Sequence, residues 1–167
     1  MNPKIITPAT QVIDLVRGKL QCKITGNDRN DDVADAIAAA RDYAQAFLGV
    51  PVGPQTLQYT FASWCGAVTL PFDVTTVVSV TAAGVAVSPL PTLGADDRTL
   101  TFAAVAPVVI RLTCGYTIAT LPSMVKSAML LMIADLVRNP QAQSEVQLYK
   151  NHAVDNLLWP HRARVSL

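Results

Sequence analysis

The segment from Leu121 to Asn139, LPSMVKSAMLLMIADLVRN, constrains the fold of this chain more than any other. Pro122 favours the first turn of a helix, and Asn139 precedes Pro140, which disfavours a helical conformation. One helix is therefore predicted over residues 122–139. Apolar residues recur at spacings of three and four and extend beyond one face, so we expect a helix covered on most sides. Its expected core and assembly positions are Val125, Met129, Met132, Ile133 and Leu136.

A membrane-spanning interpretation of this helix is not supported by its charges. Lys126 and Asp135 confine the uncharged run to eight residues, whereas a membrane span needs about eighteen. No other segment resembles an anchor, and the amino terminus MNPKIITPAT lacks the apolar core of a secretory signal. We therefore expect no membrane partner, and a protein that stays in the cytoplasm where it is made.

The composition points to subunit interfaces. Hydrophobic residues make up 51% of the 167 residues and charged residues only 15%, which leaves a monomer of this size short of polar groups to cover its surface. The alternative is a monomeric domain with a large core. A net charge of +1 provides no strong field to attract nucleic acid, so tight DNA binding is not expected. Three widely spaced cysteines predict reduced packing residues, not a disulfide framework.

Periodicity and end signals predict three further helices, over residues 8–20, 31–48 and 145–158. Thr7 and Pro8 are interpreted as the N-cap and first residue of the earliest one. The apolar face of that helix is expected to contain Val12, Ile13, Val16 and Leu20. Gly49 ends the second helix, and Pro160 ends the last.

Over residues 55–114 the period of the apolar residues changes to two, which is typical of strands. Candidate strands cover residues 55–61, 68–70, 74–82, 85–87, 99–102 and 108–114. Ala83-Gly84 is expected to form a turn because of its composition. The predicted fold is α+β: a mainly α-helical bundle of about four helices, with a small antiparallel β-sheet inserted between the second and third long helices. Residues 1–167 are expected to form a single domain.

Motifs for catalysis or metal binding are absent from the sequence. Asp28, Asn30 and Asp32 alternate like the first ligands of a calcium loop, but Val33 and Ala39 occupy the positions of its required glycine and acid. We interpret the three as helix-capping residues. The only histidines are His152 and His161, and His152, at helical spacing from Asp155, is interpreted as part of a solvated or interface pair. No enzyme activity, cofactor or metal is expected.

Six local patterns nevertheless occur in a fixed order from Ile6 to Arg162. They are Ile6-Thr7-Pro8, DDVADAIAAARDYAQAFLG from Asp31, Pro54-Gln55-Thr56-Leu57, Cys114-Gly115-Tyr116, LPSMVKSAMLLMIADLVRN, and AVDNLLWPHR from Ala153. Each pattern alone is ordinary, but together they resemble the head-tail connector (adaptor) proteins of long-tailed bacteriophages. The chain departs from the usual pattern at Leu136-Val137, where that family commonly has aromatic residues, and at Cys114, where it has a small residue.

The resemblance implies a ring of identical subunits, a dodecamer on the virion, that docks on the portal protein of the filled capsid. It also implies a downstream partner, a stopper or tail-terminator protein of the neck. Double-stranded DNA would pass only as non-specific cargo, and the protein would lie in the virion neck after assembly in the host cytoplasm. An apolar, nearly neutral chain suits a head-to-tail ring, which buries two different faces of every subunit. The alternatives are a small cytoplasmic DNA-binding module using Arg162 and Arg164, and an enzyme using His152.

Residues 160–167 follow the last predicted helix and contain too few apolar residues to belong to the core. Val165 and Leu167 alternate with polar residues, so this tail could add to a partner as a strand or place two apolar anchors in it. A terminus without function is the alternative. We assign docking to the portal or to a neighbouring subunit to Trp159, Arg162, Arg164, Val165 and Leu167.

Overall fold

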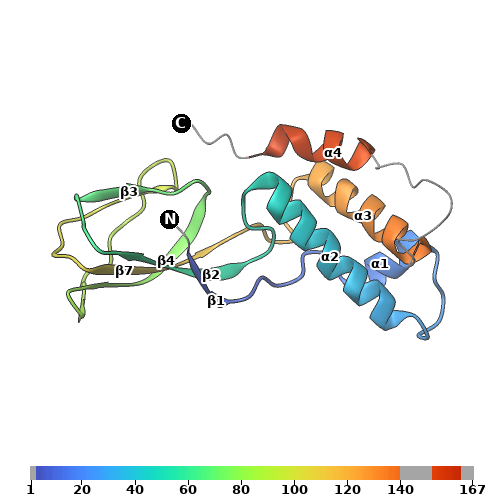
Figure 1. Ribbon diagram of the computed structural model, residues 1–167, viewed down its shortest axis with the longest axis horizontal. Helices are drawn as coiled ribbons and strands as arrows, with labels where there is room; N and C mark the ends of the chain where they lie inside the picture. Colours follow the sequence, from blue (N-terminus) through green and yellow to red (C-terminus); the bar gives the residue numbers. More distant parts are fainter. Residues whose placement is uncertain (1–2, 140–151, 163–167) are drawn as a thin grey trace. The chain divides into compact units, whose positions relative to one another are not determined.

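The computed structural model describes residues 3–139 and 152–162, which divide into two compact units (Figure 1). A β unit contains residues 3–10 and 53–116, and a helical unit contains residues 11–52, 117–139 and 152–162. The expectation that residues 1–167 act as a single connector domain stays a prediction.

The β unit is built on a five-stranded antiparallel sheet with the strand order β1-β2-β7-β4-β5. Its strands are β1 (Lys4–Thr7), β2 (Gln55–Phe61), β4 (Val74–Ala82), β5 (Val85–Ala86) and β7 (Val108–Cys114). A second, two-stranded sheet pairs β3 (Ala67–Thr69) with β6 (Thr99–Thr101). The bounds of β2, β4 and β7 are those predicted, and those of β3, β5 and β6 differ by one residue.

The central strand β7 shows why this sheet has one buried face. The side chains at alternate positions from Val108 to Cys114 are at most 1% exposed, whereas Arg111 between them is exposed. This is the alternation expected of a strand that is covered on one side. Aromatic rings extend the buried face, because Phe61 of β2 packs edge-on against Trp64 and Trp64 packs against Phe102, with centroid distances of 5.3 and 4.5 Å.

The helical unit contains α1 (Leu15–Cys22), α2 (Asn30–Leu48), α3 (Ser123–Arg138), α4 (His152–Leu158) and a short 3-10 helix, η1 (Trp159–His161). Helix α3 packs against α1, α2 and α4. Val125, Met129 and Ile133 are at most 1% exposed, as expected for the core of this unit. Met132 is half-buried and Leu136 is 38% exposed, so the latter lies at the surface of the unit.

The prediction of a mainly helical bundle with a small sheet is wrong. About 36% of the described residues are helical and 24% are in strands, and the larger sheet has five strands. One of these, β1, precedes the first helix instead of lying between two helices. All four of its residues are exposed, so it lacks the alternation of buried and polar residues by which the other strands were predicted.

The predicted start of the first helix is also wrong. Residues 8–14 are not helical, and α1 begins at Leu15 after Asp14, whose Oδ1 accepts a hydrogen bond from the backbone N–H of Arg17 at 2.6 Å. An Asp at this position satisfies a free amide of the first turn. Pro8 instead follows the end of β1. Val16 and Leu20, which were expected on one apolar face with Val12 and Ile13, are 68% and 65% exposed, whereas Val12 and Ile13 are buried. Residues 145–151 of the predicted last helix lie outside the described residues.

Gly53 provides a test of how closely two segments of the β unit approach. A Cβ atom at this position would overlap the backbone carbonyl oxygen of Thr10, and the φ angle of Gly53 is +104°. The N–H of Thr10 also donates to the carbonyl of Pro54 at 3.1 Å, so the two segments cannot move apart without losing this hydrogen bond. Gly53→Ala should therefore lower the free energy of unfolding of this unit by about 2 kcal/mol or more, measured by denaturant unfolding.

Gly66→Ala is the matched control for that substitution. Gly66 has a similar φ of +93°, but a Cβ atom added there would have no other atom within 4 Å. The free energy of unfolding of Gly66→Ala should fall only by the roughly 1 kcal/mol that a positive φ costs an L-residue. Equal losses in the two variants would contradict the close approach of Thr10.

Candidate interaction surface

An aromatic cluster with one arginine lies on the surface of the helical unit. The rings of Tyr43 and Phe47 on α2 stack with centroids 6.2 Å apart, and Trp159 of η1 packs edge-on against Phe47 at 6.3 Å. The guanidinium carbon of Arg162 lies 5.9 Å from the centroid of Phe47 and 5.6 Å from that of Trp159. We call these four residues the Trp159 cluster.

Local structure brings the members of the cluster together. Tyr43 and Phe47 are four residues apart on α2 and hence on one face of that helix. The hydroxyl of Tyr43 donates to Oδ1 of Asp155 at 2.7 Å, which ties α2 to α4. Helix α4 continues into η1, where Pro160 fixes the backbone beyond Trp159.

Composition makes this cluster a candidate binding site. Trp159 is 64% exposed, Arg162 is exposed, and the two α2 rings are half-buried. Tryptophan, tyrosine and arginine are the residues that contribute most often to binding energy at protein interfaces. The exposed Trp159 and Arg162 therefore offer an apolar and a cationic side chain to a partner.

Two of the residues predicted to dock a partner, Trp159 and Arg162, thus lie side by side. Arg164, Val165 and Leu167 lie outside the described residues. The sequence analysis singled out neither Tyr43 nor Phe47 as a binding residue. The spacing of two aromatic residues at i and i+4 was the available signal, but only their contact with η1 distinguishes a surface cluster from a core position.

Among the described residues, the histidine considered for catalysis lies at the surface and no metal-binding cluster is present. His152 is exposed at the start of α4, and Asp155 accepts the hydrogen bond of Tyr43. Within residues 3–139 and 152–162, no group of three or more His, Cys, Asp or Glu residues could hold a metal ion. In the same part of the chain, no helix is both long and apolar enough to cross a membrane.

The prediction that Asp28, Asn30 and Asp32 cap the second helix is wrong, because α2 begins after Arg29 without a side-chain capping hydrogen bond. The amide oxygen of Asn30 accepts a hydrogen bond from Lys19 Nζ at 3.0 Å, and Asp32 pairs with Arg29 at 3.0 Å. The cysteines are free thiols. Cys22, Cys65 and Cys114 form no disulfide. Burial raises the pKa of the Cys114 thiol to about 12, so this residue remains a neutral packing group.

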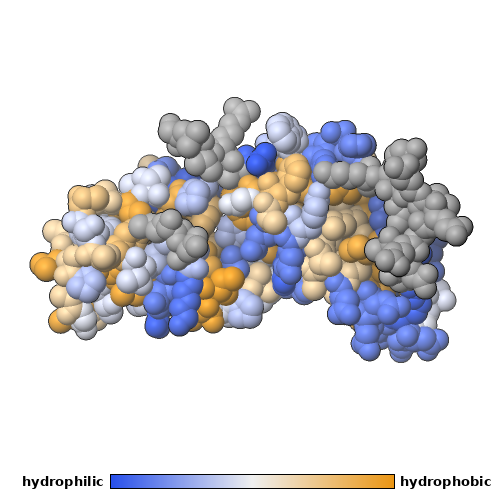
Figure 2. Space-filling model, in the orientation of Figure 1, coloured by the Kyte–Doolittle hydropathy of each residue, from blue (hydrophilic) through white to orange (hydrophobic). Residues whose placement is uncertain are grey.

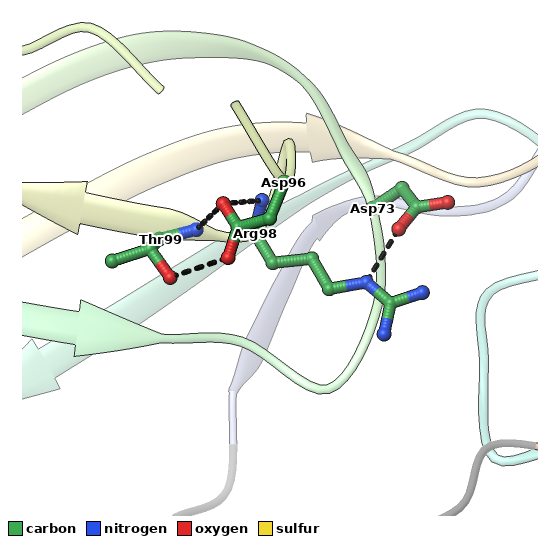
Figure 3. Close-up of polar contacts among 4 residues, drawn as sticks. All are labelled: Asp73, Asp96, Arg98 and Thr99. Atoms are coloured by element: carbon green, nitrogen blue, oxygen red, sulfur yellow. Dashed lines mark hydrogen bonds and ion pairs between the residues drawn. The ribbon is translucent and has the colours of Figure 1, made fainter. Parts of the chain in front are cut away.

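A polar network closes the turn before β6 in the β unit (Figure 3). Asp96 Oδ2 accepts from the hydroxyl of Thr99 at 2.7 Å, while Oδ1 accepts from the backbone N–H groups of Arg98 and Thr99 at 3.1 and 3.0 Å. Arg98 Nε donates to Asp73 Oδ1 at 2.6 Å. The hydrogen bonds from Thr99 and Arg98 lower the pKa of the Asp96 carboxyl from 3.8 to about 2. The network consists of Asp73, Asp96, Arg98 and Thr99, whose contacts with one another hold the turn. We therefore assign it a structural role.

This pKa shift predicts an acid-dependent loss of stability. Because the folded-state pKa of Asp96 lies below its ordinary value, the carboxylate stabilises the fold fully above about pH 4, and this contribution is lost as the pH falls towards 2. Asp96→Asn should have a lower melting temperature than the wild type at pH 7. Its melting temperature should also fall less than that of the wild type when the pH is lowered from 4 to 2. Asp97→Asn, at the exposed neighbouring residue, is the control. Parallel pH profiles for the wild type and Asp96→Asn would contradict the assignment.

Comparison with known proteins supplies two findings, although no family model matches the chain. Over 44 residues, the chain is 48% identical to the head completion protein gp6 of Enterobacteria phage HK97. This segment is 26% of the chain and 41% of that protein, so the chain matches less than half of the length of this relative.

The solved structures that share the fold come from gene transfer agent (GTA) particles. All of this chain aligns with 98% of a chain from the neck of an empty GTA particle, computed with C6 symmetry, with a TM-score of 0.79 and 16% identity. The same coverage holds for a chain of the native GTA virion, with a TM-score of 0.77 and 17% identity. For the neck of the native particle, computed with C12 symmetry, the TM-score is 0.71 and the identity 17%.

At these identities the structural likeness establishes the fold. The shared segment adds a relationship in sequence to a head completion protein. Together the two findings agree with the order of motifs along the chain, and the protein resembles the head-tail connector proteins of long-tailed bacteriophages.

Proposed function

We propose that the protein is a structural component of a virion neck, a head-tail connector that forms a ring and links a DNA-filled capsid to the tail-proximal neck protein. The observation that carries this proposal is the likeness over the whole chain to a protein of the GTA neck. The segment shared with a head completion protein supports it independently, because it is a likeness of sequence and not of fold.

The proposed assembly is a cyclic homo-oligomer, with twelve subunits on the virion. The C6 and C12 symmetries applied to the similar GTA necks support a cyclic arrangement. Permanent interfaces between subunits often bury about 2,000 Å² or more. A chain with 51% hydrophobic residues can supply an apolar interface of this area, and the closed ring would bury that surface.

The proposed partners are the portal protein on one side of the ring and a stopper or tail-terminator protein on the other. We assign portal docking to the Trp159 cluster together with the tail residues Arg164, Val165 and Leu167. Exposed Trp159 and Arg162 provide the aromatic and cationic anchors that such a contact uses. Double-stranded DNA passes through the ring as non-specific cargo, which a net charge of +1 permits. The protein has a structural role and no catalytic one.

The deciding experiment mixes the purified protein with the portal protein of the same particle. Light scattering should detect a stoichiometric complex, and negative-stain images should show rings on the portal. Addition of double-stranded DNA at physiological salt should give no tight complex, in contrast to the DNA-binding alternative. If neither the protein alone nor its mixture with the portal forms rings, the connector function is wrong.

A further inference from the structure

Helix α1 presents an apolar face that nothing in the described part of its unit covers. Val16 and Leu20 are four residues apart, hence neighbours on one face, and they are 68% and 65% exposed. Arg17 and Lys23, also exposed, flank them with positive charge. We call these four residues the α1 face. Large aliphatic side chains that are grouped and rimmed by charge are typical of interaction sites.

The side of α1 opposite the α1 face packs against α2. A Cβ atom on Gly18 would lie 2.9 Å from Ile37 Cδ1 and 3.0 Å from Val33 Cγ1, so this side of α1 lies close against those two side chains of α2. Val16 and Leu20 are each two residues from Gly18, which is about 200° around the helix. The α1 face is therefore directed away from α2.

Helix α2 has a matching outer surface. Asp35 lies two residues from both Val33 and Ile37 and so faces away from α1 by the same geometry. Further exposed residues follow along that side of the helix, which we call the α2 stripe: Asp31, Asp35, Ala39, Asp42 and Ala46. Figure 2 shows the beginning of α2 and its preceding loop as hydrophilic surface at the lower right.

The charges of the α2 stripe complement those of the α1 face. Among the described residues, neither Asp31 nor Asp35 forms an ion pair, whereas Asp42 pairs with Arg41 at 2.7 Å. The alanines of the stripe, Ala39 and Ala46, are small and allow close approach of an aliphatic side chain. An apolar, basic helix face and a small, acidic one thus lie on opposite sides of the same pair of helices.

We propose that the α1 face of one subunit docks on the α2 stripe of a second copy of this chain. Two unlike surfaces on opposite sides of a subunit produce a head-to-tail contact, and such contacts close into rings. The apolar pair Val16 and Leu20 supplies burial, while Arg17 and Lys23 set the register against Asp31 and Asp35. This inference rests on the proposed ring and identifies its subunit contact.

Charge reversal tests the contact. The α1 variant combines Arg17→Glu with Lys23→Glu, and the α2 variant combines Asp31→Lys with Asp35→Lys. Each variant places like charges opposite each other and should assemble at a concentration more than about tenfold higher than the wild type. Circular dichroism must show wild-type helix content. Rings are counted by negative stain and masses by light scattering, with and without the portal protein.

Mixing the two variants gives a result that a folding defect cannot imitate. In an equimolar mixture, acidic α1 faces meet basic α2 stripes and basic α1 faces meet acidic α2 stripes, so alternating rings should form again near the wild-type concentration. Leu20→Ser should weaken assembly without altering charge. Lys4→Glu and Val105→Ser, at exposed positions of the β unit, are the matched controls and should assemble normally.

The outcomes separate this inference from the proposed function. If the wild type forms rings and both charge variants form them equally well, the subunit contact lies elsewhere and the inference is overturned, while the connector function stands. If the variants fail singly and also fail when mixed, the pairing of these two faces is wrong. If the wild type itself forms no ring, both the function and the contact are rejected.

Discussion

A chain carrying Met129→Asp is expected to be insoluble or unfolded. Met129 lies in the middle of α3, which packs against three other helices, and its side chain is 1% exposed. An aspartate at this position buries an unpaired carboxylate and removes the apolar contacts of the methionine. The combined cost exceeds about 5 kcal/mol, which is comparable with the roughly 5–15 kcal/mol of a typical domain's total stability. Soluble yield and circular dichroism are the measurements.

Leu136→Asp provides the matched control on the same helix. Leu136 is 38% exposed, so an aspartate at this position keeps its hydration and should cost roughly 1 kcal/mol or less. Ile133→Asp, at a fully buried position, should reproduce the defect of Met129→Asp. Ordinary yield and an unchanged melting temperature for Met129→Asp would contradict the central position of α3.

The elements that sequence reasoning located correctly have signals in their own residues. Strand β7 alternates between buried aliphatic and polar side chains, and α2 ends at Gly49, whose left-handed φ of 70° is a common C-cap. The hairpin between β4 and β5 turns at Ala83 and Gly84, both at positive φ, which fits a tight two-residue connection. In these cases local chemistry and tertiary structure favour the same conformation.

The elements that were wrongly predicted depend on contacts between distant segments. Strand β1 is defined by its pairing with β2, more than forty residues away, and its own residues are all exposed. Helix α1 was placed too early because Thr7 and Pro8 resemble a helix start, whereas Asp14 provides the cap. The error grouped Val16 and Leu20 with the buried Val12 and Ile13 on one apolar face, whereas in the structure the first two are exposed and form a candidate contact surface.

The candidate docking site was predictable only in part. Trp159 and Arg162 lie on either side of the helix-ending Pro160, and the segment after Pro160 has too few apolar residues for the core, so their sequence position indicated a surface role. Their neighbour Phe47 is more than one hundred residues away along the chain, and its ring contacts with Trp159 and Arg162 exist only in the folded unit. Aromatic residues at helical spacing fit a core equally well, and no local signal separates the two cases.

Removal of residues 160–167 should strongly weaken binding to the portal while leaving the fold intact. A chain ending at Trp159 loses Arg162, whose guanidinium lies over the rings of Phe47 and Trp159, together with the proposed tail anchors Val165 and Leu167. An exposed cation–π contact contributes only about 0.5–1 kcal/mol to stability, so melting temperature and helix content should change little. Loss of one hot-spot residue from an interface costs about 2 kcal/mol or more, so the loss of a single such anchor predicts a complex at least roughly thirtyfold weaker.

Two further variants assign that loss to particular residues. A chain ending at Arg162 keeps the Trp159 cluster, so retained binding would place the docking energy in the cluster, and lost binding would place it in residues 163–167. Trp159→Ala removes the exposed ring from the full-length chain and should weaken the complex by about tenfold or more, because a large aromatic anchor cannot be replaced by its neighbours. Titration with the portal protein, followed by light scattering, measures all three. If the chain ending at Trp159 binds the portal as tightly as the wild type, the docking role of residues 160–167 is refuted. If Trp159→Ala also binds as tightly as the wild type, the aromatic cluster does not dock the portal and must serve a different contact within the neck.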